Sequence, residues 1–242
     1  MQSVFRFKQF ELKHGGSGMK LTTDSLLLGA WVEPGPDVHT IVDAGSGCGI
    51  LALMCAQRFP DADITAVDNN RKAYDEALEN FKASPWSNRL HPVLDDINKW
   101  ADTIRQPVDL IICNPPYFTE TLRSPDPARA DARHAATLSA ESIIKTASRI
   151  LSKSGTLAIV IPDSHYRRLS LPASIAGLSV SRIARVAARQ GKDPSLTLLQ
   201  FSRSSTLQVA GSQTIDIRDY NGNFTDIYRQ LTHPFLLYDK KA

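Results

Sequence analysis

The chain has 242 residues, of which 42% are hydrophobic and 22% are charged, and its formal net charge at pH 7 is +3. This length and composition suit one sizeable folded core and exclude the collagen-like, disordered and disulfide-stapled classes of protein. A net charge this small is compatible with a polyanionic partner but does not require one.

The cysteines and the amino terminus indicate the cellular setting. Cys48, Cys55 and Cys113 form no C-x-x-C pair and are odd in number, which argues against disulfides and against a zinc site. The first residues mix charged and apolar side chains, so no signal peptide is predicted, and no apolar run is long enough to cross a membrane. We therefore expect a cytoplasmic protein with no metal and no membrane partner, and a monomer is favoured.

Residues 1–36 are predicted to form an N-terminal extension. Partial alternation over residues 4–12 suggests one or two edge strands, and the glycines that follow then break the chain. Residues 22–31 show the apolar spacing of a helix, which Thr23 or Asp24 is expected to cap. These strands and this helix would cover a ligand site in the core.

Residues 37–205 are predicted to form the core of an α/β protein. Short apolar runs alternate with helical segments, and this βαβ rhythm predicts parallel strands joined by right-handed crossovers. Two later strands, at 180–187 and 195–201, are close enough in sequence for an antiparallel hairpin. The prediction is a seven-stranded, mostly parallel sheet with a terminal hairpin and helices on both faces. The other strands are expected near 41–42, 64–67, 90–94, 108–113 and 156–161, and the helices near 50–59, 71–81 and 139–151.

The last segment, residues 206–242, is predicted to be a C-terminal extension packed on the core. Its pattern suggests one strand at 214–217 and one helix at 224–231. No internal repeat is present.

A glycine-rich loop joins the first core strand to its helix. The run Asp43-Ala44-Gly45-Ser46-Gly47-Cys48-Gly49 lets the backbone turn tightly and approach a ligand. The spacing is G-x-G-x-G, no G-K-[ST] follows, and an acid precedes the glycines, so a phosphate cradle is not predicted. An acid here would repel a pyrophosphate and favour a cation. S-adenosylmethionine, which carries a sulfonium and an ammonium charge, fits this requirement.

Further acids follow the next two predicted strands. Asp68, which precedes Asn69, ends the second strand, where a carboxylate can bind both hydroxyls of a ribose. Asp96, before Ile97, is placed to contact an adenine amine, with Asp95 as a competing candidate that spacing cannot separate. A helix cap or a turn would explain each acid by itself. The order acid, glycines, acid is the more specific signal.

The motif Asn114-Pro115-Pro116-Tyr117 follows the strand predicted at 108–113. Open α/β sheets bind ligands at such strand ends. Two prolines cannot continue a central strand, so the carbonyls before them need partners outside the sheet. Asn114 Oδ1 and the Pro115 carbonyl can accept the two N–H bonds of an amino group on a flat ring, while Tyr117 stacks on that ring. The alternative is a proline-rich turn.

Together these motifs resemble those of the class I methyltransferases that act on amino groups, whose Rossmann-like fold would cover about residues 21–161. The segment at residues 20–25 resembles the one that precedes the core in tRNA and rRNA members of this group and folds over the cofactor. The cofactor-binding residues that the resemblance implies are Lys20, Thr22, Thr23, Asp43, Gly45, Gly47, Gly49, Asp68, Asn69, Asp96, Ile97 and Asn114. The catalytic residues that it implies are Asn114, Pro115, Pro116 and Tyr117.

The form of the motif bears on the substrate. Asn in first place and Tyr in last occur in enzymes that methylate adenine N6, guanine N2 or protein-glutamine N5. The glutamine enzymes usually carry a separate helical N-terminal domain, which the short extension here does not match, so a nucleic-acid base is favoured. Within the group the chain most resembles the tRNA1(Val) adenine-N6 methyltransferases, which implies methylation of the adenosine 3′ of the anticodon and a tRNA partner bound at its anticodon region. The alternatives are methylation of rRNA guanine N2 or protein-glutamine N5, or a non-catalytic module that binds S-adenosylmethionine and RNA.

Residues for contact with RNA are also predicted. Tyr117 or Phe118 could stack on the target base, and the segment 123–134 could become ordered on RNA phosphates through its arginines. A solvated loop would explain those arginines equally well. The substrate-binding candidates are Tyr117, Phe118, Arg123, Arg129 and Arg133. Further basic positions that could share one face include Arg167, Arg168, Arg182, Arg185, Arg189 and Lys192.

Overall fold

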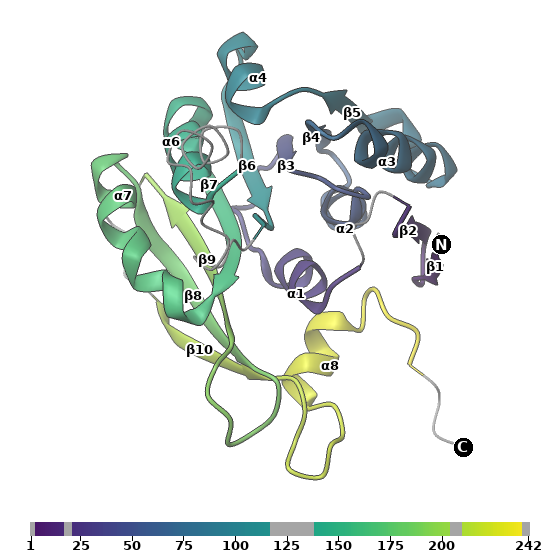
Figure 1. The fold of residues 1–242 in the computed structure, drawn as a ribbon, viewed down its shortest axis with the longest axis vertical. Helices are drawn as coiled ribbons and strands as arrows, with labels where there is room; N and C mark the ends of the chain where they lie inside the picture. Colours follow the sequence, from purple (N-terminus) through teal and green to yellow (C-terminus); the bar gives the residue numbers. More distant parts are fainter. Residues whose placement is uncertain (1–2, 17–20, 117–137, 204–209, 239–242) are drawn as a thin grey trace, which may run out of the picture.

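A computed structural model describes residues 3–16, 21–116, 138–203 and 210–238. Its centre is an eight-stranded sheet with the strand order β10-β8-β9-β7-β6-β3-β4-β5 (Figure 1). The strands are β3 Thr40–Ala44, β4 Asp63–Asp68, β5 Leu90–Leu94, β6 Val108–Cys113, β7 Leu151–Pro162, β8 Ser179–Ala187, β9 Leu196–Ser202 and β10 Ala210–Asp216. The predicted α/β class is thus confirmed.

The strand directions match the prediction, but the strand count does not. Strands β5, β4, β3, β6 and β7 pair in parallel, and β9 lies antiparallel between β7 and β8, as expected for the terminal hairpin. The sheet nevertheless has eight strands rather than seven, because β10 pairs in parallel with the outer edge of β8. A free strand edge offers a row of unpaired N–H and C=O groups, and β10 satisfies them. The predicted C-terminal extension therefore contributes a strand to the sheet.

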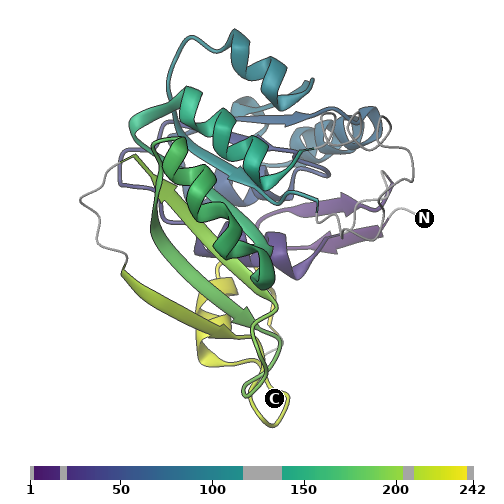
Figure 2. The same cartoon turned by 60° about the vertical axis from the view of Figure 1, so that its left-hand side comes forward.

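Helices cover both faces of the sheet, as predicted (Figures 1 and 2). One apolar core lies under α1, α2, α3 and α8, and a second lies under α4, α6 and α7 on the opposite face. The helices on the first face are α1 Thr23–Trp31, α2 Ile50–Arg58, α3 Arg71–Ala83 and α8 Asp226–Thr232. Those on the second face are α4 Ile97–Thr103, α6 Ala140–Ile150 and α7 Ser170–Ile175, with the 3₁₀ segment η3 Asp163–Leu169 before α7. A further 3₁₀ turn, η1, spans Ser87–Arg89. No helix within the described ranges is both long and apolar enough to span a membrane.

The predicted edge strands at the amino terminus do not join the main sheet. Instead, among the described residues, β1 (Ser3–Arg6) and β2 (Glu11–His14) pair only with each other, as an antiparallel hairpin beside α3 (Figure 1). The side chain of Asn80 on α3 accepts a hydrogen bond from Lys13 N at 2.9 Å and donates one to Lys13 O at 2.8 Å. A side chain therefore satisfies the backbone groups that a neighbouring strand would otherwise have bound.

The capping residue of α1 also differs from the prediction. Thr22, not Thr23 or Asp24, is the N-cap: its backbone is extended and its Oγ1 accepts a hydrogen bond from Ser25 N. Thr23 and Asp24 already belong to the helix. A capping side chain must come from the last residue before the helical dihedrals begin, so neither of them can serve.

Candidate active site

The topology brings the predicted site residues to one edge of the sheet. Strands β6, β3, β4 and β5 are adjacent and parallel, so their carboxyl ends meet at the same edge. Asp43 lies near the end of β3, Asp68 ends β4, Asp96 follows β5 and Asn114 follows β6. Four residues that are far apart in the sequence therefore line neighbouring strand ends.

The glycine-rich loop has the backbone that its sequence predicts. Gly45, Gly47 and Gly49 all have positive φ, at 71°, 56° and 82°. Residues with a side chain rarely adopt this region. A Cβ atom on Gly49 would lie 2.4 Å from Phe81 Cε1, so the loop and α3 approach too closely for any larger residue. Asn80 Nδ2 also donates to Cys48 O at 2.8 Å, which links the loop to the N-terminal hairpin.

Asp43 is fully buried and only half satisfied. Its Oδ2 accepts a hydrogen bond from Ala52 N at 3.0 Å, while its Oδ1 has no hydrogen-bond partner among the described residues. Burial, with a smaller contribution from the charge of Asp68, raises the pKa of Asp43 to about 7. A buried carboxylate with an unsatisfied oxygen calls for a hydrogen-bond donor or a positive charge. This matches the cationic ligand that the sequence predicts.

Asp68 links two strand ends. Its Oδ2 accepts a hydrogen bond from Gly47 N and its Oδ1 accepts one from Asn70 N, both at 2.8 Å. The second bond is a turn contact of the kind that would explain this aspartate without a ligand. The first holds the glycine loop against β4, while the Asp68 carboxylate stays partly exposed at the sheet edge. Asn69 beside it is exposed.

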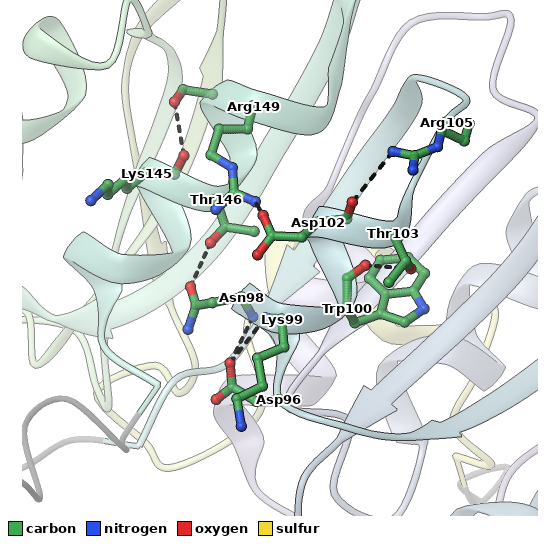
Figure 3. Close-up of polar contacts among 11 residues, drawn as sticks. Asp96, Asn98, Lys99, Trp100, Asp102, Thr103, Arg105, Lys145, Thr146 and Arg149 are labelled. Atoms are coloured by element: carbon green, nitrogen blue, oxygen red, sulfur yellow. Dashed lines mark hydrogen bonds and ion pairs between the residues drawn. The ribbon is translucent and has the colours of Figure 1, made fainter.

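The two candidate adenine ligands have different local roles. Asp96 is the N-cap of α4, and its Oδ1 accepts hydrogen bonds from Asn98 N at 2.9 Å and Lys99 N at 3.3 Å (Figure 3). Asp95 Oδ1 is bound to the backbone N–H of Asp96. The helix cap therefore occupies one oxygen of Asp96, and Ile97, the first residue of α4, is buried behind it.

Contacts with α6 hold α4 in place. Thr146 Oγ1 donates to Asn98 Oδ1 at 2.6 Å, and Arg149 pairs with Asp102 one turn further along (Figure 3). These bonds fix the direction in which α4 leaves the sheet. They thereby fix the position of Asp96 at the start of that helix.

Asn114 is bound to a residue that the sequence did not reveal. Its Nδ2 donates a 2.9 Å hydrogen bond to Ser25 Oγ on α1, and Ser25 is buried. Pro115 is also buried, whereas Pro116 is exposed. The sequence signal for Ser25 is slight: it is a polar residue that directly precedes the apolar run of α1. Its pairing with Asn114 depends on how α1 packs.

Other predicted residues are only partly placed. Thr22 and Thr23 are exposed at the start of α1. Lys20, Tyr117, Phe118, Arg123, Arg129 and Arg133 lie outside the described residues. Within the described ranges, no group of three or more His, Cys, Asp or Glu side chains is arranged to hold a metal ion. The three cysteines are free and buried, and burial raises the pKa of Cys48 and of Cys55 to about 12.

Comparisons with known proteins identify the family of this chain. Residues 21–178 match the family described as the methyltransferase small domain. The tRNA1(Val) (adenine(37)-N6)-methyltransferase of Photobacterium profundum is 36% identical to this chain and is aligned over 98% of this chain and 99% of its own length. The proteins of the same name from Aeromonas hydrophila and Bacteroides thetaiotaomicron are 37% and 35% identical, over 97% and 98% of this chain and 98% of each relative.

Solved structures share the fold at lower identity. A predicted O-methyltransferase from Agrobacterium tumefaciens has a TM-score of 0.61 and 18% identity, covering 91% of this chain and all of the other. The Thermus thermophilus 16S rRNA N2 G1207 methyltransferase, solved with AdoMet and guanosine, has a TM-score of 0.58 and 18% identity, covering 84% of this chain and 50% of the other. The chain therefore belongs to the methyltransferase small domain family, in the group of the tRNA1(Val) (adenine(37)-N6)-methyltransferases.

Proposed function

We propose that this protein transfers a methyl group from S-adenosylmethionine to the exocyclic N6 amine of an adenosine in tRNA, the adenosine 3′ of the anticodon. Relatives named for this activity are 35–37% identical to this chain over nearly the full length of both proteins. The observation that carries the proposal is the position of Asn114. It lies at the end of β6, beside the buried acid and the glycine loop on β3, with its amide nitrogen held by Ser25.

The site suits S-adenosylmethionine, whose bound form supplies an electrophilic methyl group on a sulfonium. Asp43 would face the positive charges, since it is a buried acid with one oxygen unsatisfied among the described atoms. Gly45, Gly47 and Gly49 would allow the backbone to approach the methionine part. We assign the ribose to Asp68 with Asn69 beside it, and the adenine to Asp96 and Ile97. Lys20, Thr22 and Thr23 would contribute from the segment that precedes the core.

Asn114 and Pro115 would supply the catalytic contacts. An adenine amine is a poor nucleophile because its lone pair is delocalised into the ring. Two fixed carbonyl dipoles, Asn114 Oδ1 and the Pro115 backbone oxygen, would accept its two N–H bonds and draw the nitrogen toward tetrahedral geometry. They would also stabilise the positive charge that grows on that nitrogen. The product ammonium is strongly acidic and loses its proton to water, so no general base is needed.

We also propose contacts with the RNA on the basis of the sequence. Tyr117 or Phe118 would stack on the adenine, and Arg123, Arg129 and Arg133 would contact tRNA phosphates. A tRNA substrate is consistent with the cytoplasmic location expected from the sequence, and a monomer remains the expectation.

One assay tests this function. The purified protein is incubated with radiolabelled S-adenosylmethionine and unmodified tRNA, rRNA, DNA and protein, and the labelled product is digested to nucleosides or amino acids. We expect label in N6-methyladenosine from tRNA, and at least about a hundredfold slower labelling when Asn114→Ala replaces the wild type. Label in guanosine from rRNA, or in protein glutamine, would instead assign the same chemistry to a different substrate.

A further inference from the structure

The hydrogen bond between Asn114 and Ser25 has a consequence for catalysis. A primary amide can present either its oxygen or its nitrogen to a ligand, and the two faces are nearly the same in shape. Only the oxygen can accept an N–H bond from an amine. The proposed reaction therefore requires that Asn114 point its nitrogen away from the substrate and its oxygen toward it.

Ser25 meets this requirement. Asn114 Nδ2 donates to Ser25 Oγ at 2.9 Å, which places the Oδ1 atom on the opposite side of the amide. Ser25 is 8% exposed, so water can hardly replace its hydroxyl as the acceptor. Thr22 caps the first turn of α1: its Oγ1 accepts a hydrogen bond from Ser25 N. This bond fixes the backbone of Ser25, and with it the position from which its side chain reaches Asn114.

We propose that Ser25 is a positioning residue that sets the amide orientation of Asn114 and so enables methyl transfer. Ser25 acts through Asn114 and does not itself contact the reacting atoms. This inference rests on the function proposed above. It also gives α1, which the sequence predicts within an extension that covers the cofactor, a part in positioning Asn114.

The test compares steady-state methylation by four proteins: wild type, Ser25→Ala, Asn114→Ala and the double variant. Losing one oriented hydrogen bond inside a buried site should lower kcat of Ser25→Ala by about tenfold to a hundredfold. The affinity for S-adenosylmethionine and the KM for tRNA should stay within about threefold. In the Asn114→Ala background, the same serine substitution should have no further effect on the residual rate.

Two controls separate positioning from folding. Ser84→Ala removes another buried hydroxyl, which binds Phe81 O at the end of α3, and should leave kcat unchanged. Ser25→Thr keeps the hydroxyl and should restore most of the rate; thermal unfolding of each variant reports whether α1 is intact. The proposal is overturned if Ser25→Ala keeps a wild-type kcat, or if it slows the Asn114→Ala variant by the same factor as the wild type. Failure of the wild type to methylate tRNA would overturn the proposed function instead.

A second, independent observation concerns the 3₁₀ segment η3. Strand β7 runs parallel to β6, with Ile159 paired to Cys113, so η3 begins at the same sheet edge as the motif that follows Cys113. The guanidinium carbons of Arg167 and Arg185 each lie 5.8 Å from the centre of the Tyr166 ring. Asp163 binds Arg185 through two hydrogen bonds, at 2.8 and 2.5 Å, and leaves that side chain partly exposed.

Not every predicted basic residue shares this face. Arg182 instead packs over Trp31 and forms an ion pair with Glu33 on the other side of the sheet. Its charge is therefore used in contacts within the protein. Arg167 is exposed and lies beside Arg168, so three arginines stand against two aspartates: Asp163, and Asp193, whose charge also acts on Arg185. Guanidinium groups held beside an aromatic ring suit RNA, since they can bind phosphate while the ring contacts a base or sugar.

We infer that Tyr166, Arg167 and Arg185 form a surface that contacts the tRNA next to the target adenosine. This inference also rests on the proposed function. The measurement is the dissociation constant for tRNA over a series of salt concentrations. Arg167→Gln should weaken binding and lower the slope of log Kd against log salt by about 0.7 to 1, the change expected for one lost phosphate contact. The affinity for S-adenosylmethionine and kcat at saturating tRNA should not change.

Arg105 provides the matched control. It is an exposed arginine that precedes β6, at the opposite edge of the same sheet, and Arg105→Gln should leave the salt slope unchanged. Equal salt slopes for Arg167→Gln and wild type would overturn the proposal that this surface contacts tRNA. Equal losses of tRNA affinity in Arg167→Gln and Arg105→Gln would also overturn it. They would mean that any lost positive charge weakens binding, wherever it lies on the protein. A wild type that binds and methylates tRNA normally in that experiment would leave the proposed function intact.

Discussion

Gly47 and Asp68 are joined by a 2.8 Å hydrogen bond from the backbone N–H of Gly47 to Oδ2 of Asp68. The bond connects the loop after β3 to the end of β4, so two residues predicted to bind different parts of one cofactor also hold each other. Because of this bond, a change at Asp68 will affect the shape of the glycine loop as well as the ribose contact.

Asp68→Asn should therefore weaken the binding of S-adenosylmethionine by at least about tenfold, because it removes a charged hydrogen-bond acceptor and loosens the loop. Isothermal titration calorimetry measures the affinity directly. Asp75→Asn is the matched control, since Asp75 is an exposed acid on α3 whose ion pair with Arg71 contributes little. Unchanged affinity for S-adenosylmethionine in Asp68→Asn would show that Asp68 does not bind the cofactor.

Asn114→Ala should lower kcat by a factor on the order of 10² to 10³, because the lost dipole acts mainly on the charge that develops in the transition state. Binding of S-adenosylmethionine should remain within a few-fold of wild type. Single-turnover methylation of tRNA gives the rate. Asn221→Ala, in an exposed loop, serves as the control. A kcat within about tenfold of the wild-type value would disprove the amine-alignment mechanism.

Asp43 should make the cofactor-free protein less stable as pH rises. Its pKa is raised from the ordinary 3.8 to about 7 by burial, so between these values the folded state holds a proton that the unfolded state has lost. The contribution of Asp43 to stability is fully present below pH 3.8 and is lost as pH rises through about 7. Urea unfolding from pH 4 to pH 8 should show this fall, and Asp43→Asn should remove it.

The same carboxyl group predicts proton release when the cofactor binds. A cationic ligand beside Asp43 favours the ionised form and lowers its pKa, so near pH 7 a proton should leave the protein on binding. Calorimetric titration in buffers with different ionisation enthalpies counts that proton. Binding with no proton release in the wild type, or with the same release in Asp43→Asn, would contradict this role.

Gly49→Ala should destabilise the protein through both backbone and packing. A non-glycine residue in the left-handed region costs about 1–2 kcal/mol, and the added methyl group would lie 2.4 Å from Phe81 Cε1, where overpacking adds about 1–3 kcal/mol. Gly222→Ala separates the two effects, because Gly222 has a similar φ of 86° and an added Cβ there would have no atom of the described residues within 4 Å beyond its own chain neighbours. Equal losses of unfolding free energy in the two variants would show that the close contact with Phe81 adds nothing to the cost of the substitution.

Local sequence patterns were enough for most of the core. The apolar runs near residues 64–67, 90–94 and 108–113 are strands in the structure, and the helices predicted near 50–59, 71–81 and 139–151 are α2, α3 and α6. The same patterns placed Asp43, Asp68, Asp96 and Asn114 at or just beyond the carboxyl ends of strands. Once the strands are parallel, their carboxyl ends must meet at one edge, so position in the sequence was sufficient to gather these residues.

Long-range packing decided what these patterns could not. Whether β10 pairs with β8, whether the hairpin of β1 and β2 joins the sheet, and which hydroxyl reaches Asn114 depend on groups distant in sequence that compete for the same hydrogen bonds. Periodicity describes only how a segment alternates between buried and exposed positions, and it contains no information about which partner satisfies a given N–H or hydroxyl. The sequence thus determined the family and the order of the site residues, and the tertiary structure decided that Ser25 meets Asn114.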